Sequence, residues 1–257
     1  MNASQTKPGV RADIQVALTP ALYHGGADIV VAVDVLRATT AICAAFQAGA
    51  DEIVPLDSLD ALWPYRAKGY LLAAERGGLK VGDAEYGNSP TEYLRNDLHG
   101  RRLAYSTTNG TRCILRGADA KKTLVGSFAN ISVLADHLIQ SASSCEAAGR
   151  ECTITIICSG WEGIFCIEDT LFAGALIEQL TAQPSILNSQ FSISNDSARM
   201  ALDLWQMGKD NPYAWCLPRA SHIRRLDGFG AHADVEFAFR ADTCPVVPRL
   251  EDGRLTR

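Results

Sequence analysis

The sequence predicts an α/β protein in which helices cover both faces of a mostly parallel sheet. Short apolar segments alternate with helical segments at least five times along the 257 residues, which is the pattern of a layered fold with parallel strands. The apolar runs at 29–33 and 153–158 are continuous and β-branched, as expected for strands that are buried on both faces. We therefore expect a three-layer α/β/α arrangement.

Residues 29–40, IVVAVDVLRATT, contain the strongest element. Five apolar residues form the expected strand, and Asp34, Arg37, Thr39 and Thr40 follow before an alanine-rich helical segment. Ligands of parallel sheets collect at the carboxyl ends of the strands. A helix that begins there offers unbonded N–H groups and the positive end of its dipole. Asp34 and Arg37 are therefore expected where a metal and an anion would bind.

The other elements follow from periodicity and from turn residues. Ile42, Ala45 and Phe46 have helical spacing, and residues 89–92 fit a capping box that begins a helix. Further strands are expected at 13–18, 52–55, 70–74, 102–106 and 124–126. Further helices are expected at 58–68, 131–138, 168–180, 194–206 and 221–226, with a break at Pro64 because proline lacks the N–H group. The final quarter of the chain is expected to be mostly helical.

The chain is expected to form one domain over residues 1–257, which can be divided into lobes at 1–145 and 146–257. Residues 141–150 are small and polar, so we expect an interior linker there. The stretches 29–42 and 154–170 share one form, an apolar strand followed by an acid-bearing loop and a helix of small residues. This similarity suggests an internal duplication. The first twelve residues are expected to be a loose leader without a secretory signal.

Composition narrows the class of protein. The net charge of −5 argues against binding to nucleic acid or to an anionic membrane surface. No apolar run approaches the roughly 20 residues that span a bilayer. The eight cysteines contain no CxxC pair and several lie in apolar runs, which is typical of a reduced, cytoplasmic protein without a zinc site. A homodimer is a candidate assembly, because folds of this kind often dimerise.

The loop TTNGT at residues 107–111 is a candidate anion site. Hydroxyl groups, an amide and a glycine that opens a helix suit a tetrahedral oxyanion, because the backbone can come close and its N–H groups point at the ligand. The alternative is a capped helix after a strand, which any α/β protein needs. The sequence contains no GxxxxGK[ST] loop of the Walker type.

Arginines and carboxylates near the other strand ends have two interpretations each. Arg37 and Arg76 could bind phosphate or sulfonate oxygens, or could pair with a carboxylate that holds two loops together. Two or three carboxylates that converge with water and a substrate phosphate would form a Mg²⁺ site. The alternative for a carboxylate in a first helical turn is that it complements the helix dipole. The candidate metal ligands are Asp34, Glu75, Asp83, Glu168 and Asp169.

The sequence lacks the motifs of the cysteine and aspartyl phosphatases, which use a covalent nucleophile. A cysteine phosphatase built on Cys158 would need arginine at position 164, where isoleucine stands. An aspartyl phosphatase built on Asp34 would need an acid at position 36, where leucine stands. Cys158 is therefore expected to be a buried structural thiol, and most of the five histidines are expected to be bystanders.

Motifs along nearly the whole chain resemble the 2-phosphosulfolactate phosphatase family. The matching stretches are VAVDVLRATT (31–40), AERGG (74–78), GNSP (87–90), TTNGT (107–111), GSFAN (126–130), CSGWEGIFCIED (158–169), AG (173–174) and DTCPVVP (242–248). The resemblance implies an α/β/α fold and Mg²⁺-dependent hydrolysis of (2R)-O-phospho-3-sulfolactate to (2R)-3-sulfolactate and phosphate. The alternatives are a phosphatase for another small phosphorylated hydroxy acid, or a non-catalytic binder of a phosphorylated or sulfonated metabolite.

The resemblance and the loops together define the expected site. Asp34, Arg37, Glu75 and Asp169 are the expected catalytic residues, and Arg76 is expected to hold the sulfonate or carboxylate end of the substrate. The other expected substrate-binding residues are Asn88, Ser89, Thr107, Thr108, Asn109, Gly110, Thr111, Ser127, Asn130, Ser159 and Gly160. The predicted hydrolase function requires these distant loops to meet in one pocket.

Overall fold

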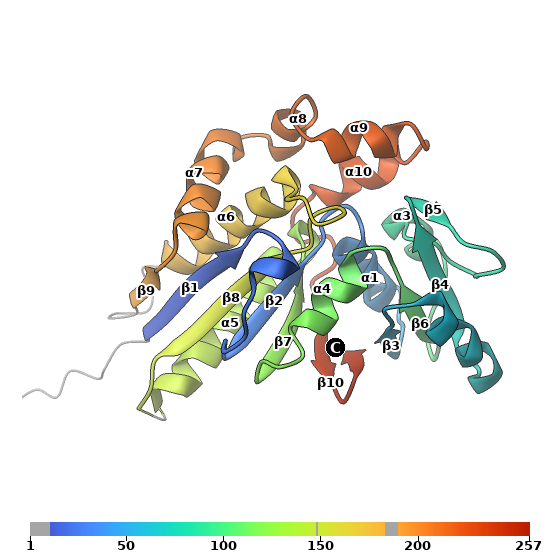
Figure 1. The fold of residues 1–257 in the computed structure, drawn as a ribbon, viewed down its shortest axis with the longest axis horizontal. Coiled ribbons are helices and arrows are strands. Elements are labelled where there is room, and N and C mark those ends of the chain that lie inside the picture. Colours follow the sequence, from blue (N-terminus) through green and yellow to red (C-terminus); the bar gives the residue numbers. More distant parts are fainter. Residues whose placement is uncertain (1–10, 148, 183–189) are drawn as a thin grey trace, which may run out of the picture.

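The computed structural model describes residues 11–147, 149–182 and 190–257. Most of the expected leader lies outside these residues. Within the described residues, eleven strands form one sheet in the order β5-β4-β6-β3-β11-β10-β7-β2-β8-β1-β9 (Figure 1). The strands are β1 (Arg11–Ala17), β2 (Ile29–Val33), β3 (Glu52–Pro55), β4 (Leu71–Arg76), β5 (Leu79–Lys80), β6 (Arg102–Ser106), β7 (Lys122–Gly126), β8 (Cys152–Cys158), β9 (Gln190–Ile193), β10 (Arg249–Glu251) and β11 (Arg254–Thr256).

Most of the sheet is parallel, as expected. The strands β7, β2, β8, β1 and β9 form one parallel group, and β3, β6 and β4 form a second. The antiparallel hairpin β10–β11 lies between the two groups and joins them. Val33 is in register with Gly126 on one side and with Cys158 on the other. The carboxyl ends of β7, β2 and β8 therefore lie at one edge, and the loops that follow them meet there.

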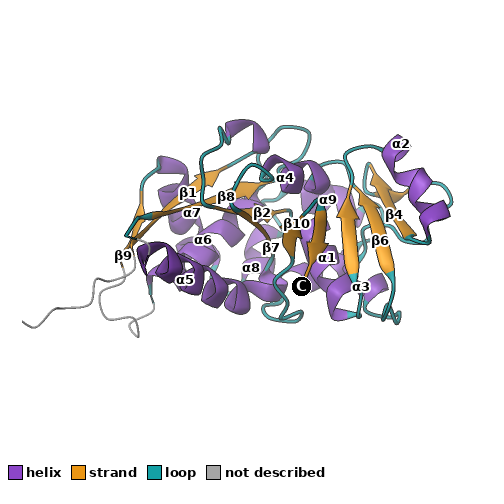
Figure 2. Ribbon diagram, turned by 90° about the horizontal axis from the view of Figure 1, so that it is seen from below, coloured by secondary structure: helices purple, strands orange, loops and turns teal. Residues whose placement is uncertain are grey.

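Helices cover both faces of the sheet (Figure 2). They are α1 (Ala38–Gln47), α2 (Leu59–Leu62), α3 (Pro90–Tyr93), α4 (Gly110–Arg116), α5 (Ile131–Ala147), α6 (Ile167–Thr181), α7 (Asp196–Gly208), α8 (Pro212–Cys216), α9 (Ser221–Asp227) and α10 (His232–Ala238). Three short 3₁₀ helices are η1 (Pro20–Leu22), η2 (Trp63–Lys68) and η3 (Phe128–Asn130). The break expected at Pro64 is present, because α2 ends at Leu62 and η2 follows it.

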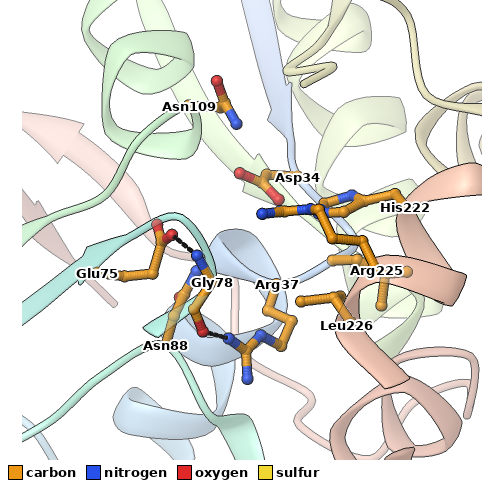
Figure 3. Close-up of a pocket in the computed structure, with 10 residues that line it drawn as sticks. Asp34, Arg37, Glu75, Gly78, Asn88, Asn109, His222, Arg225 and Leu226 are labelled. Carbon is orange, nitrogen blue, oxygen red and sulfur yellow. Dashed lines mark hydrogen bonds between the residues drawn. The ribbon is translucent and has the colours of Figure 1, made fainter. Parts of the chain in front are cut away.

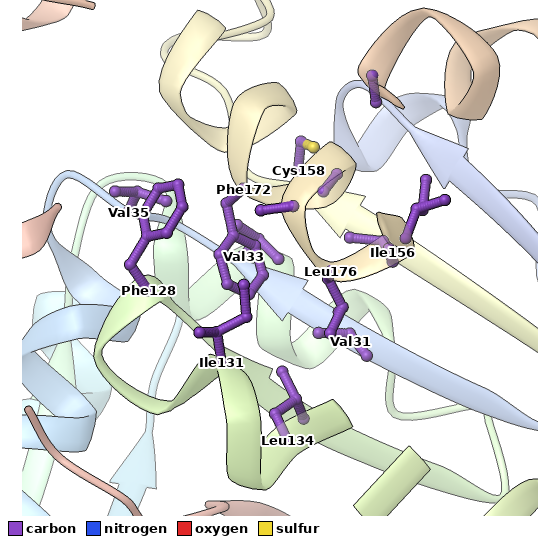
Figure 4. Packing of buried hydrophobic residues seen from close by; sticks show 14 of the residues in the cluster. Val31, Val33, Val35, Phe128, Ile131, Leu134, Ile156, Cys158, Phe172 and Leu176 are labelled. Carbon is purple, nitrogen blue, oxygen red and sulfur yellow. The ribbon is translucent and has the colours of Figure 1, made fainter. Parts of the chain in front are cut away.

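The two faces of β2 pack in different hydrophobic clusters. Val31 and Val33 contact residues of α5 and α6, including Leu134 and Phe172 (Figure 4). Val30 and Ala32 belong to a second cluster with residues of α1 and α4. Full burial of each large apolar side chain contributes about 1.5–3 kcal/mol to folding. The strand is therefore held rigidly in the middle layer, and the expected three-layer α/β/α fold is confirmed.

The prediction of an interior linker at 141–150 is wrong, because α5 continues through most of this stretch. Ser143 and Ser144 donate hydrogen bonds to the carbonyl oxygens of Ile139 and Gln140 one turn earlier, which satisfies their hydroxyl groups inside the helix. Ala142 is fully buried against the sheet, so packing extends a helix that composition alone would end. The strand β8 lies between β2 and β1, so strands from both expected lobes alternate in one sheet. The internal duplication stays a prediction.

The last quarter contains strands as well as the expected helices. The hairpin β10–β11 has only three residues in each strand, which is too short for a periodic pattern to reveal it. In the described part of the chain no helix is long and apolar enough to cross a bilayer. All eight cysteines lie in described segments, and each is buried and free.

Candidate active site

A cleft opens at the carboxyl edge of the sheet (Figure 3). Its walls come from five parts of the chain, namely the segment after β2, the end of β4 with its turn, the loop before α3, the loop before α4, and α9. The lining residues are Asp34, Leu36, Arg37, Glu75, Gly78, Asn88, Asn109, His222, Arg225 and Leu226. The expectation that distant loops meet in one cavity is therefore confirmed for Asp34, Arg37, Glu75, Asn88 and Asn109.

Asp34 directly follows β2 and is held by its own segment. Its main-chain carbonyl accepts hydrogen bonds from the amide and the hydroxyl of Thr39, and its Oδ1 accepts from the amide of Ala38 at 3.3 Å. Among the described residues no group donates to its Oδ2. A side chain at Gly110 would come within 2.7 Å of Oδ2, so the glycine allows α4 to approach the carboxylate.

Asp34 belongs to a group of buried carboxylates. The pKa of Asp34 is raised to about 6, mainly by burial; the nearby Glu75 and Glu168 contribute to the rise, and the amide of Ala38 opposes it. Burial also raises the pKa of Asp169 well above its usual range, with Asp34 and Glu168 adding to the effect. This crowding of carboxylates disfavours their ionised forms unless a cation is present.

Asp169 and Glu168 open α6, as expected, but make different contacts. Asp169 accepts hydrogen bonds from the amides of Val35 at 2.8 Å and Gly160 at 3.0 Å, so both of its oxygens join the loops after β2 and β8. Glu168 Oε1 lies 2.9 Å from Nδ1 of His222. Its Oε2 is buried and has no hydrogen-bond partner in the described structure.

Glu75 ends β4 and holds the TTNGT loop in place. Its Oε1 accepts from the amide of Gly78 at 2.5 Å, and its Oε2 accepts from the amide of Thr108 at 3.1 Å. Thr107 and Thr111 bond one another through their hydroxyl groups and main chains. Asn109 begins α4 without a side-chain cap and lines the cleft. The loop is thus partly internal structure and partly cleft wall.

Arg37 forms a buried ion pair with Asp234, a partner that the sequence analysis did not identify. Its guanidinium donates to Oδ2 of Asp234 at 2.9 Å and to the carbonyl oxygen of Gly78 at 2.7 Å. Oδ1 of Asp234 accepts from the hydroxyls of Ser89 and Thr91. The alternative interpretation of Arg37, a pair that holds two segments together, is therefore present, although the side chain also lines the cleft.

His222 and Arg225 enter the cleft from α9, and neither was among the expected site residues. Arg225 donates from one guanidinium nitrogen to Nε2 of His222 at 2.9 Å and from the other to the carbonyl oxygen of Gly77 at 3.0 Å. His222 is thus an exception to the expectation that the histidines are bystanders. The one available signal was that His222 and Arg225 are three residues apart, which places them on the same face of a helix. Nothing in the sequence indicated that this face lies at the strand ends.

Several expected site residues lie outside the residues that line the cleft. Arg76 bonds the carbonyl and hydroxyl of Ser106, and Asp83 is exposed. Ser127 and Asn130 form a capping box that begins η3, and Asn130 also donates to the carbonyl oxygen of Val246. The others are Ser89, Thr107, Thr108, Gly110, Thr111, Ser159, Gly160, Glu168 and Asp169, which support the loops around it. Roles for these residues in binding stay predictions.

Comparison with known proteins identifies relatives along most of the chain. Residues 17–253 match the family model described as 2-phosphosulpholactate phosphatase. A protein of Prochlorococcus marinus named probable 2-phosphosulfolactate phosphatase is 35% identical over 243 residues, covering 89% of this chain and 94% of its own. A Synechococcus protein of the same name is 37% identical, covering 91% and 94% of the two chains. The chain therefore belongs to the 2-phosphosulpholactate phosphatase family.

Proposed function

We propose that this protein is a Mg²⁺-dependent phosphatase that hydrolyses (2R)-O-phospho-3-sulfolactate to (2R)-3-sulfolactate and phosphate. The observation that carries the proposal is the cleft lined by the carboxylates Asp34 and Glu75 and by Arg37 and Arg225, in which the Arg225 guanidinium lies beside Asp34 (Figure 3). Carboxylates that can hold a metal and cations that can hold an anion are the two requirements of phosphoryl transfer. The relatives' printed name supports the choice of substrate.

The carboxylates present fit Mg²⁺. This ion prefers oxygen ligands and usually keeps several waters, so it needs only one or two carboxylates besides the substrate phosphate. Among the buried carboxylates expected as ligands, Asp34 Oδ2 and Glu168 Oε2 accept no hydrogen bond from the described residues. In contrast, Glu75 and Asp169 already use both oxygens, and Asp83 is exposed outside the cleft. Asp34, which lines the cleft, would therefore hold the ion, and the buried Oε2 of Glu168, whose charge acts on Asp34, is the second free oxygen.

When bound, Mg²⁺ would supply charge neutralisation at a phosphoryl oxygen and a more acidic water. The chain's own residues fix the positions around it. Asp169 anchors the segment after β2 by bonding the amide of Val35, which keeps the Asp34 carboxylate directed at the cleft. Asp234 holds the Arg37 guanidinium against the turn at Gly78. Such fixed groups need no rearrangement when charge develops during the reaction.

Water is the proposed nucleophile, because the chain lacks both covalent patterns. Cys158 is fully buried, and burial beside Asp169 raises the pKa of its thiol well above the usual range. A thiol of this kind is not ionised near neutral pH and cannot attack phosphorus efficiently.

The proposal is tested with purified protein, Mg²⁺ and phosphosulfolactate, with phosphate release as the readout. We expect release that EDTA abolishes and added Mg²⁺ restores. Undiminished turnover in EDTA would remove the metal from the proposal. A protein that phosphosulfolactate stabilises against heat but that releases no phosphate would instead be a binder. Comparison of kcat/KM for phosphosulfolactate and phospholactate separates this substrate from other phosphorylated hydroxy acids.

A further inference from the structure

The two arginines of the cleft differ in how their charge is balanced. Arg37 pairs with Asp234 at 2.9 Å, and both side chains are buried, so its charge is neutralised locally. Arg225 forms no ion pair with any carboxylate in the described part of the chain. Its contacts are a carbonyl oxygen, a neutral ring nitrogen and an aromatic face. A cation without a counterion at a cleft is suited to bind an anionic ligand.

The Arg225 guanidinium is held in a defined orientation. It lies over the ring of Trp161, 4.6 Å from the ring centroid, and it donates to Gly77 O at 3.0 Å. Its Nε is buried and has no hydrogen-bond partner within the described structure. Stacking on an aromatic face fixes the plane of the guanidinium, so little side-chain entropy is lost when an oxyanion binds. Figure 3 shows the group beside Asp34 and across the cleft from Glu75.

His222 positions this arginine through a defined tautomer. Because Arg225 can only donate, Nε2 of His222 must accept, and the ring proton of the neutral imidazole is then on Nδ1. That proton points at Oε1 of Glu168, 2.9 Å away. The protonated Nδ1 cannot bind a metal, although Cys166 and Glu168 lie near it. Glu168, His222 and Arg225 therefore form a chain of hydrogen bonds that ends at the cleft.

We propose that Arg225, positioned by His222, binds one of the two acidic groups of the substrate that are not transferred, the sulfonate or the carboxylate. This inference rests on the proposed function, in which the phosphoryl group lies at Asp34 with Mg²⁺. Phosphosulfolactate carries a sulfonate and a carboxylate besides its phosphate, so a second cationic site is required. Arg76, the earlier candidate for this role, is outside the cleft and bonds Ser106. Arg225 selects substrates that carry a second anion.

The test compares Arg225→Gln with Arg224→Gln, the adjacent position on the same helix. Arg224 is exposed and donates to the carbonyl oxygen of Pro218, so it is a matched control for loss of one positive charge. We expect Arg225→Gln to raise the KM for phosphosulfolactate about 10- to 100-fold, the range for loss of charge-assisted hydrogen bonds. The control should change KM less than about 2-fold, and Arg225→Lys should recover part of the loss.

The choice of acidic group is tested with three substrates. Glycerol 2-phosphate has neither acid and phospholactate has only the carboxylate. If Arg225 holds the sulfonate, the preference for phosphosulfolactate over both others collapses in Arg225→Gln. If it holds the carboxylate, phospholactate loses as much as phosphosulfolactate and only the preference over glycerol 2-phosphate falls. An equal loss with all three would place Arg225 at the phosphoryl group and overturn the inference, and an unchanged KM would do so too.

The role of His222 is tested with His222→Leu and His222→Gln, after circular dichroism has shown that both variants fold like the wild type. Glutamine can still accept from Arg225, whereas leucine cannot. A higher KM in the leucine variant, partly restored by glutamine, supports positioning, and equal KM values would overturn it.

If wild-type protein releases no phosphate, the proposed function fails, and titration with 3-sulfolactate still tests the subsite. Wild-type protein and Arg224→Gln should bind 3-sulfolactate at least about 10-fold more tightly than Arg225→Gln, and equal binding would refute the subsite.

Discussion

Arg37 and Asp234 are 197 residues apart in the sequence and form an ion pair of 2.9 Å in which both side chains are buried. The pair ties the segment after β2 to α10. Because Asp234 also accepts from Ser89 and Thr91, the same carboxylate ties α10 to the start of α3. Three segments that shape one side of the cleft are thus held together by a single side chain.

Replacement of Asp234 by alanine should therefore lower the stability strongly. Removing one partner leaves the Arg37 cation buried and uncompensated, which typically costs about 3–5 kcal/mol. Denaturant unfolding measures the change in the free energy of unfolding. Glu236→Ala is the matched control, because Glu236 lies on the same helix and pairs with Arg240 at an exposed position. The control should lose less than about 1 kcal/mol, and equal losses would show that burial of the pair is not what matters.

Replacement of Asp34 by asparagine should raise the stability in metal-free buffer above about pH 6. The pKa of Asp34 is about 6 in the folded protein, against 3.8 for an ordinary aspartate, so the folded state holds this proton more tightly than the unfolded chain does. Its contribution to stability is complete below about pH 4 and is lost as the pH rises towards 6. Asparagine removes this loss, which amounts to about 1–3 kcal/mol.

Thermal unfolding of both proteins between pH 4 and 8 with EDTA checks this expectation. The two melting temperatures should diverge as the pH rises. Curves that stay parallel would show that Asp34 ionises normally. Addition of Mg²⁺ should raise the melting temperature of the wild type more than that of the variant, because a bound ligand stabilises the state that binds it.

Replacement of Gly110 by alanine should impair the site through packing. The added Cβ would lie 2.3 Å from Cβ of Ala38 and 2.7 Å from Oδ2 of Asp34, so α4 must move away from the carboxylate. Overpacking of this kind costs about 1–3 kcal/mol, and a displacement of about 1 Å at a catalytic group can reduce the rate about 100-fold. Phosphate release and thermal unfolding measure the two effects. Wild-type kinetics would show that the approach of α4 to Asp34 has no role.

Replacement of Cys158 by alanine should leave the turnover nearly unchanged. The thiol is fully buried at the end of β8 and does not line the cleft. The variant should lose about 1 kcal/mol of stability from the small cavity and keep kcat within about 3-fold, since a factor of 3 corresponds to less than 1 kcal/mol in the barrier. A loss of activity by a factor of 1000 or more would indicate a covalent cysteine mechanism.

The sequence predicted the part of the site that depends on local structure. Residues 29–40 carry their own evidence, because a continuous apolar strand must be followed by a loop at the carboxyl edge and Asp34 is its first residue. Glu75 was found for the same reason at the end of β4. Both positions follow from chain order, without knowledge of what packs against them.

The rest of the site depends on contacts over long distances. Asp234, His222 and Arg225 lie on short helices in the last quarter of the chain, where no strand end marks a binding edge. Their roles follow from the way α9 and α10 fold back over the sheet, which no local pattern encodes. Ser127 and Asn130 were expected to bind substrate, but they form a capping box. The sequence could not separate the two roles, because a capping box has the same residue types as an oxyanion loop.

The most direct test compares phosphate release by Asp34→Asn and Asp83→Asn with phosphosulfolactate and saturating Mg²⁺. Both changes remove one carboxylate, but Asp34 lines the cleft and Asp83 is exposed outside it. Asp34→Asn should lose about 100- to 1000-fold in kcat/KM, the range for removal of one strong electrostatic contribution to the transition state, and Asp83→Asn should keep wild-type activity. Wild-type activity in Asp34→Asn would contradict a metal-assisted phosphatase centred on this carboxylate.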